Sequence, residues 1–126
     1  MDADWQEIEH RVGMAVFHFG KVATISAPDE YVTSMAIRHA ILCGEREIDH
    51  AFATLRRVHA KGAGISVLPD STRRAYLRVR ALGYEDIANP SDINPVTLVY
   101  AIAATRVMAE FLQDDFQQIR REIIGV

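Results

Sequence analysis

The chain has 126 residues, of which 49% are hydrophobic and 25% are charged, and it carries a formal net charge of -3. These values are ordinary for a globular domain and exclude an intrinsically disordered chain, whose hydrophobic content would be lower. They predict a single domain of residues 1–126 that is large enough to bury a core without disulfide bonds.

Cellular location is predicted from what the sequence lacks. No apolar run approaches the ~18 residues of a membrane span, and the acidic start of the chain is the opposite of a basic signal peptide. Cys43 is the only cysteine, which excludes an internal disulfide and favours a reducing compartment. We therefore expect a soluble, cytoplasmic protein. We interpret Cys43 as a small buried side chain, with a reactive thiol as the alternative.

Apolar residues spaced three and four apart predict amphipathic helices along most of the chain. The first helix is expected to begin at Asp4, as its cap, and to extend to about Gly20. A second helix begins near Ser26 and is expected to end at Gly44, and a third covers residues 45–60. The predicted inner faces of the second and third helices consist of Tyr31, Met35, His39, Leu42, Ile48, Phe52, Leu55 and His59.

Two further helices are predicted in the second half of the chain. Asp70 or the serine after it caps a short fourth helix that stops at Gly83. Asn94 caps a fifth helix, with Pro95 at the first position, where proline is favoured. Because no breaker follows until the last two residues, this helix is expected to have about 29 residues and a length of about 44 Å. No segment predicts a strand. The predicted fold class is therefore all-α, a bundle of four to five helices with a long C-terminal helix.

The C-terminal helix carries an apolar stripe with a regular 3.5-residue repeat. The stripe consists of Leu98, Ile102, Thr105, Ala109, Leu112, Phe116, Ile119 and Ile123. It can pack on the other helices of the same chain, or it can form a seam between copies. We favour the seam because so long a helix overhangs a domain with a radius of gyration of about 14 Å. The predicted partner is a second copy, most simply in a homodimer, and the predicted interface consists of Leu98, Ile102, Leu112, Phe116, Ile119 and Ile123. The first half of the helix is apolar nearly all round, which predicts burial on all sides.

Positive charge is concentrated in residues 56–80, which hold seven basic residues and one acidic residue, a balance of +6 that leaves the rest of the chain at -9. The basic residues are Arg56, Arg57, Lys61, Arg73, Arg74, Arg78 and Arg80. On the fourth helix the arginines lie opposite the apolar face. We predict that the seven form a surface for an acidic protein partner, with nucleic acid as the alternative and salt links within the chain or oligomer as the third interpretation.

Two Glu-x-x-His pairs, Glu7 with His10 and Glu47 with His50, match the spacing that di-iron helical bundles use. The helical period places these pairs away from the apolar faces. We interpret them as neighbours on the surface and predict no metal and no cofactor.

Two further histidine patterns have chemical interpretations. His39 and His59 fall on predicted apolar faces, where a hydrogen-bonded core histidine is usual and an acid–base or ligand pair is the alternative. Arg46 and His50 resemble the arginine–histidine active site of HEPN-type ribonucleases. Their interval is shorter than in that family, and the polar residue expected after the arginine is absent. We assign no catalytic residue.

These features predict a small non-catalytic helical protein that binds or regulates through protein–protein contacts as a homo-oligomer. A nucleic-acid-binding regulator that uses the arginine-rich segment is the alternative. A helical enzyme, either metal-dependent or nuclease-like, is the third hypothesis. No association with a membrane is expected.

Overall fold

The structure, a computed structural model, describes residues 2–25, 30–59, 64–83 and 92–125. Within these ranges there are four α-helices and no strand. The α-helices are α1 (Asp2–Lys21), α2 (Glu30–Val58), α3 (Asp70–Gly83) and α4 (Pro95–Ile119). The short helices are η1 (Val22–Thr24), η2 (Ile65–Val67) and η4 (Arg120–Ile124), and η4 continues α4 as a π-helical turn. The predicted all-α class with a long C-terminal helix is confirmed.

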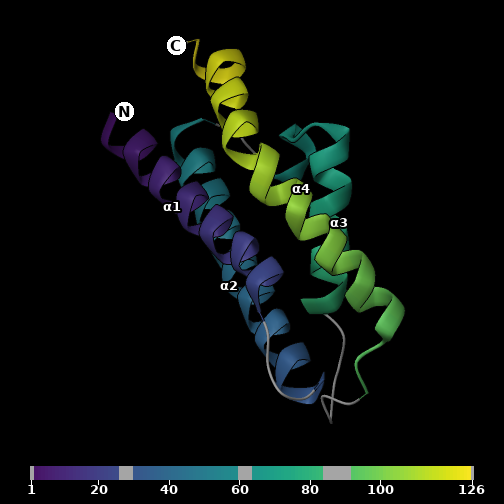
Figure 1. Ribbon diagram of the computed structural model, residues 1–126. Coiled ribbons are helices and arrows are strands. Elements are labelled where there is room, and N and C mark those ends of the chain that lie inside the picture. The colour runs from purple at the N-terminus through teal and green to yellow at the C-terminus, as the bar shows by residue number, and fades with distance from the viewer. Residues whose placement is uncertain (1, 26–29, 60–63, 84–91, 126) are drawn as a thin grey trace.

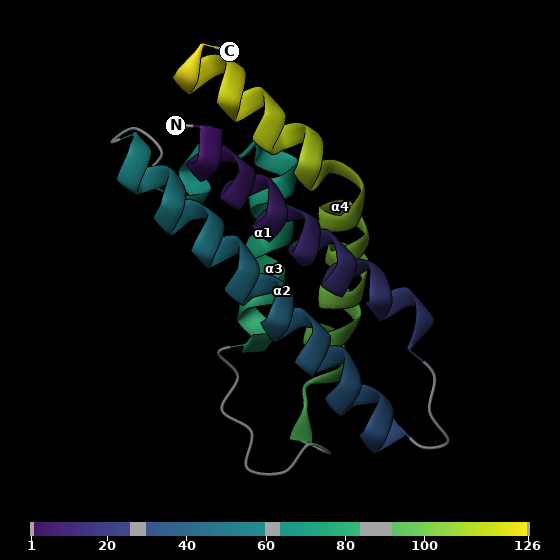
Figure 2. The same ribbon diagram turned by 90° about the vertical axis from the view of Figure 1, so that its left-hand side faces the viewer.

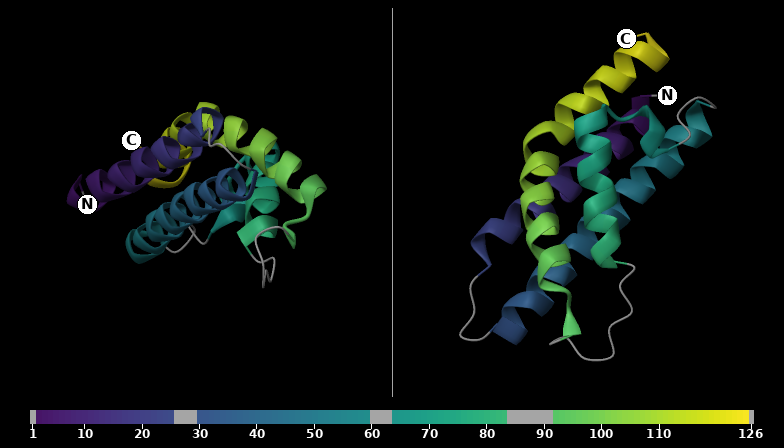
Figure 3. Two further views of the ribbon diagram at one scale, coloured as in Figure 1. Left: turned by 60° about the horizontal axis from the view of Figure 1, so that its bottom comes forward. Right: turned by 90° about the vertical axis from the view of Figure 1, so that its right-hand side faces the viewer.

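The four helices form two layers of two antiparallel helices. α1 packs along α2 in one layer, and α3 packs along α4 in the other (Figure 1). Figure 2 shows the bundle with the α1–α2 layer in front. The right-hand view of Figure 3 shows it with the α3–α4 layer in front. The start of α1 and the end of the C-terminal helix lie at the same end of the bundle.

The hydrophobic core lies between the layers. Large side chains with less than 2% exposure include Tyr76, Phe19, Ile8, Ile41, Ile48 and Leu112. The rings of Phe52 in α2 and Phe116 in α4 meet across the layers, with centroids 5.4 Å apart. Burial of each such side chain contributes about 1.5–3 kcal/mol to folding.

α3 ends and α4 starts where the sequence predicts. α3 runs from Asp70 to Gly83, so Asp70 is its first residue and neither Asp70 nor Ser71 is its cap. The side chain of Asn94 accepts hydrogen bonds from the backbone N–H groups of Val96 at 3.0 Å and Thr97 at 3.4 Å. Asn94 is therefore the predicted N-cap. α1 instead begins at Asp2, so Asp4 lies in its first turn and is not its cap.

The prediction that Gly44 ends a helix is wrong, because Gly44 lies in the middle of α2, a single helix of 29 residues. The role of Gly44 is to let α1 approach. A Cβ atom at position 44 would lie 2.7 Å from the ring of Phe19 in α1, closer than any van der Waals contact. Phe19 is 1% exposed and has nowhere to move. A residue without a side chain is therefore required at this crossing.

The continuity of α2 also corrects its inner face. Ile48, Phe52 and Leu55 are buried as predicted. In an unbroken helix their face extends back to Ile41 and Ile37, seven and eleven residues before Ile48, and both are buried. The face predicted for the first half is wrong, since Met35 and His39 are exposed, Leu42 is half-buried, and the side chain of Tyr31 lies outside the described part. The error follows from treating α2 as two helices with independent faces.

The role of Gly44 predicts opposite effects for two glycine-to-alanine substitutions. Gly44→Ala should lower the free energy of unfolding by about 1–3 kcal/mol, because overpacking against Phe19 outweighs the gain in helix propensity. Gly13→Ala in α1 meets nothing within 4 Å and should raise it by up to about 1 kcal/mol. Urea denaturation of the two variants measures both changes. Equal stabilisation by both would show that the contact between Phe19 and Gly44 does not constrain the fold.

Candidate binding surface

The apolar stripe of the C-terminal helix packs mostly inside its own chain. Leu112, Phe116 and Ile119 are at most 2% exposed, while Leu98 and Ile102 are half-buried. The side chain of Ile123, also assigned to the seam, lies outside the described part. This packing matches the first of the two interpretations of the stripe. A second copy could reach the three buried side chains only if the bundle opened.

The opposite side of α4 carries four of the eight large hydrophobic side chains that are exposed among the described residues. Exposure is 62% for Val96, 64% for Val99, 52% for Tyr100 and 45% for Phe111. The prediction that this half of the helix is buried on all sides is wrong, because α1 and α3 cover only part of it. We call this surface the outer face of α4. It consists of Val96, Val99, Tyr100, Ala103 and Phe111, with Val107 half-buried at its edge.

The helix that contains α4 is also apolar enough to resemble a membrane-spanning helix. In the described part of the chain, the stretch Pro95–Glu122 is long and apolar enough to cross a membrane by length and composition. A core helix of a globular protein passes the same test. Here the apolar residues are divided between the core side, with Leu112 and Phe116, and the outer face.

The fold distributes the seven predicted partner-binding residues over different sites. Arg56 and Arg57 are exposed in the last turn of α2. Arg57 also donates to the carboxylate of Asp4 in α1 at 3.4 Å. Lys61 lies outside the described residues. Arg56 and Arg57 therefore belong to the end of the bundle where α1 begins.

Two of the arginines of α3 interact within the helix, on its side toward α2. Arg73 donates a hydrogen bond to Asp70. The guanidinium of Arg80 lies over the ring of Tyr76, 5.6 Å from its centroid. These contacts agree with the interpretation of the arginines as intramolecular partners.

Arg74 and Arg78 are exposed on α3. The guanidinium of Arg78 lies 5.2 Å from the ring centroid of Tyr100, which belongs to the outer face of α4. This cation–π contact joins the basic helix to the apolar surface. Part of the predicted basic surface thus forms an edge of the outer face.

The glutamates of the two Glu-x-x-His pairs both bind the same residue, Arg11. Arg11 donates to Glu7 at 2.8 Å and to Glu47 at 3.1 Å, and so joins α1 to α2. These carboxylates, Glu7 first, raise the pKa of Arg11. His10 and His50 are exposed, as the helical period predicts. No group of three possible metal ligands occurs among the described residues.

His39 and His59 do not meet. His39 lies within α2, and His59 directly follows the last residue of the same helix. The 20 residues between them correspond to about 30 Å. His39 is exposed and lies 3.6 Å from the sulfur of Cys43, which is itself half-buried. The prediction of an inward histidine at position 39 is wrong, and the structure gives no acid–base pair.

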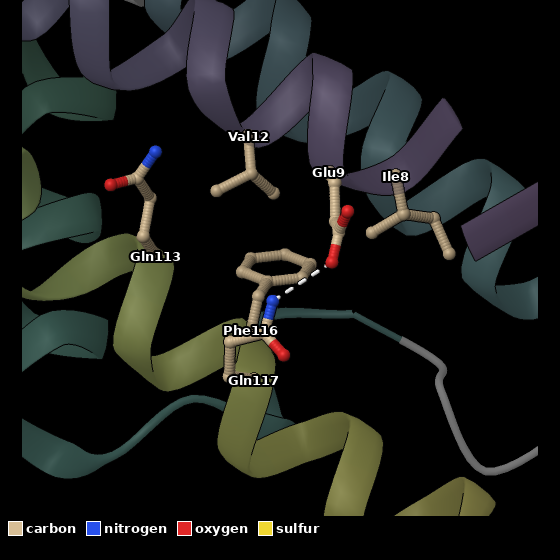
Figure 4. Close-up of a pocket in the computed structure, with 6 residues that line it drawn as sticks. All are labelled: Ile8, Glu9, Val12, Gln113, Phe116 and Gln117. Atoms are coloured by element: carbon tan, nitrogen blue, oxygen red, sulfur yellow. Dashed lines mark hydrogen bonds between the residues drawn. The ribbon is translucent and has the colours of Figure 1, made fainter. Parts of the chain in front are cut away.

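A depression of about 360 Å³ lies between α1 and α4 (Figure 4). Its walls are Ile8, Glu9, Val12, Gln113, Phe116 and Gln117. The carboxylate of Glu9 accepts hydrogen bonds from Gln117 at 3.0 Å and from the indole of Trp5 at 2.9 Å. Glu9 and Gln117 are thus bonded to each other across the depression, which joins α1 to α4.

A polar cluster between α2 and α3 was not anticipated from the sequence. Tyr76 donates a hydrogen bond to Asp49 at 2.8 Å, and burial, together with this bond, raises the pKa of Tyr76. One carboxylate oxygen of Glu45 is buried without a partner among the described residues. Burial raises the pKa of Glu45 to about 7, while the charge of Arg80 lowers it and that of Asp49 raises it.

No family model, curated protein or solved structure matches the chain. Function is therefore inferred from the chemistry of these surfaces alone.

The packing of Phe116 distinguishes a core residue from an interface residue. Phe116→Ala should lower the free energy of unfolding by about 3–5 kcal/mol, as expected for a phenylalanine removed from a core. Phe111→Ala on the same helix serves as the control, because Phe111 is 45% exposed, and its effect should stay below about 1 kcal/mol. Thermal and urea denaturation measure both. Comparable losses for the two variants would contradict the assignment of Phe116 to the core.

The raised pKa of Glu45 makes stability depend on pH. Because the folded state binds the proton more tightly than the unfolded state, this contribution is fully present below about pH 4.5 and is lost as pH rises through about 7. Glu45→Gln should therefore be more stable than the wild type at pH 8, by on the order of 1 kcal/mol after allowance for solvent screening. The two curves should converge near pH 4.5. Asp92→Asn is the control: it removes a carboxylate that is exposed rather than buried, and it should change stability by less than about 0.5 kcal/mol.

Proposed function

We propose that this chain is a small, non-catalytic binding or regulatory protein that acts through protein–protein contacts as a homo-oligomer, with the outer face of α4 as its contact surface. One observation carries the proposal. Eight large hydrophobic side chains are exposed in the described part of the chain, and four of them lie together on this face. Scattered exposed hydrophobics are normal, but a contiguous apolar surface is typical of an interaction site.

The size of the surface supports contact with a protein. Two aromatic side chains and two valines that are each about half exposed offer on the order of 400 Å² of apolar area. This value lies within the range of the functional patches of monomeric proteins, about 300–600 Å². The depression between α1 and α4 suits a small molecule less well, because its carboxylate is already hydrogen-bonded.

The charge at the edge of the face favours an acidic partner over a neutral one. Arg74 and Arg78 are exposed on α3, and Arg78 already lies over Tyr100. A carboxylate of a partner could bind these guanidinium groups while its apolar residues cover the face. Such rim charges mainly accelerate association and select the orientation of the partner.

The proposal is tested by two aspartate substitutions at exposed apolar positions. Val99 is 64% exposed on the face, and Val32 is 47% exposed on α2, in the other layer of the bundle. Val99→Asp should remain folded and lose captured protein at least tenfold, because a charge is placed within the apolar contact. Val32→Asp should capture the same proteins as the wild type. The measurement is affinity purification from the source cells, with untagged copies of the chain counted among the captured proteins.

Two outcomes of this experiment would count against the proposal. If both variants capture the same proteins as the wild type, the outer face of α4 is not the contact surface. If nuclease treatment of the lysate abolishes capture by the wild type, the contacts pass through nucleic acid, and the arginine-based alternative replaces the proposal.

A further inference from the structure

The outer face of α4 is partly symmetric about its middle. Its apolar positions are 96, 99, 100, 103, 107 and 111, and Ala103 lies near the middle of this series. When two such helices run antiparallel with their Ala103 residues opposed, Val99 of each lies level with Val107 of the other. Val96 and Tyr100 lie level with Glu110 and Arg106, each next in sequence to an apolar residue of the face.

We propose that the outer face of α4 binds a second copy of the chain, in an antiparallel pair of α4 helices whose two-fold axis passes between the Ala103 residues. The inference rests on the proposed function and names the occupant of its surface. In this register Tyr100 packs on Val107 of the second copy, and Phe111 packs near Val96. Alanine at the centre allows the two backbones to approach closely, as small residues do at helix crossings.

The charged residues along the face fit the same register. Arg106 is exposed on the flank of α4 that carries Val99, and its methylene groups would cover Val99 of the second copy while its charge stays in water. Glu110 lies opposite position 96, in the first turn of the partner helix. The positive end of a helix dipole attracts a carboxylate there. Each copy supplies both contacts, as a two-fold interface requires.

The area of the face sets the expected strength of the pair. On the order of 400 Å² of apolar surface is about half of the ~800 Å² that each partner contributes to a standard interface. The flanking residues Arg106, Glu110 and Val107 supply part of the rest. We therefore expect a reversible dimer that forms at micromolar concentrations, in which Leu112, Phe116 and Ile119 stay in the core of each chain.

Cysteine cross-linking tests the register. In a chain in which Cys43→Ala removes the native thiol, Ala103→Cys should yield a covalent dimer on mild oxidation, because the two-fold axis brings the two substituted positions within the 4.4–6.8 Å between Cα atoms that a disulfide needs. Ala53→Cys, an exposed alanine on α2, is the matched control and should stay monomeric. Equal cross-linking at both positions, or none at Ala103, would overturn the register.

Light scattering tests the pair without modification. The wild type at ~100 μM should have twice the mass of one chain, and Val32→Asp on α2 should have the mass of the wild type. Ala103→Asp should have the mass of one chain, because it would place two carboxylates against each other at the two-fold axis. Circular dichroism confirms that each variant is folded. A wild type that is monomeric at this concentration would overturn the inference. If in that case Val99→Asp still abolishes capture of a different protein, the outer face of α4 remains the contact surface of the proposed function, and only its homo-oligomer part fails together with the second copy.

Discussion

The ring of Phe19 lies against the backbone of Gly44, and this contact lets α1 lie close along an unbroken α2. The middle of α2 then binds both of its neighbours. Glu47 accepts a hydrogen bond from Arg11 of α1, and Asp49 accepts one from Tyr76 of α3. Because these two positions project about 200° apart on a helix, α2 binds α1 on one side and α3 on the other. The arrangement of the layers depends on that continuity.

The sequence predicted the elements whose ends are determined locally. Asn94 followed by proline marks the start of α4 because caps act through the nearest backbone groups. Gly44 could not be interpreted in this way, since its role depends on a phenylalanine 25 residues earlier in the chain. The same glycine would end a helix if it adopted a positive φ angle, but among the described glycines only Gly64 and Gly125 do so. Local sequence patterns do not reveal the tertiary contact with Phe19 that explains why glycine occurs at position 44.

The candidate site was predictable only in part, because a repeat identifies a face without saying what covers it. The 3.5-residue stripe of α4 was predicted correctly as an apolar face, but its C-terminal half, with Leu112 and Phe116, packs inside the chain. A second apolar series, from Val96 to Phe111, was present in the same helix, but its burial was predicted and its exposure was not. Deciding which series is exposed requires the positions of α1 and α3, and these follow from the contacts of α2.

The charge distribution connects the two surfaces that the sequence suggested separately. Arg73 and Arg80 interact within α3, so the segment's excess of positive charge does not form one patch. What remains at the outer face of α4 is Arg78, held over Tyr100, with Arg74 one turn away on the same helix. Positive charge therefore borders the apolar face on the α3 side, where Arg78 contacts it.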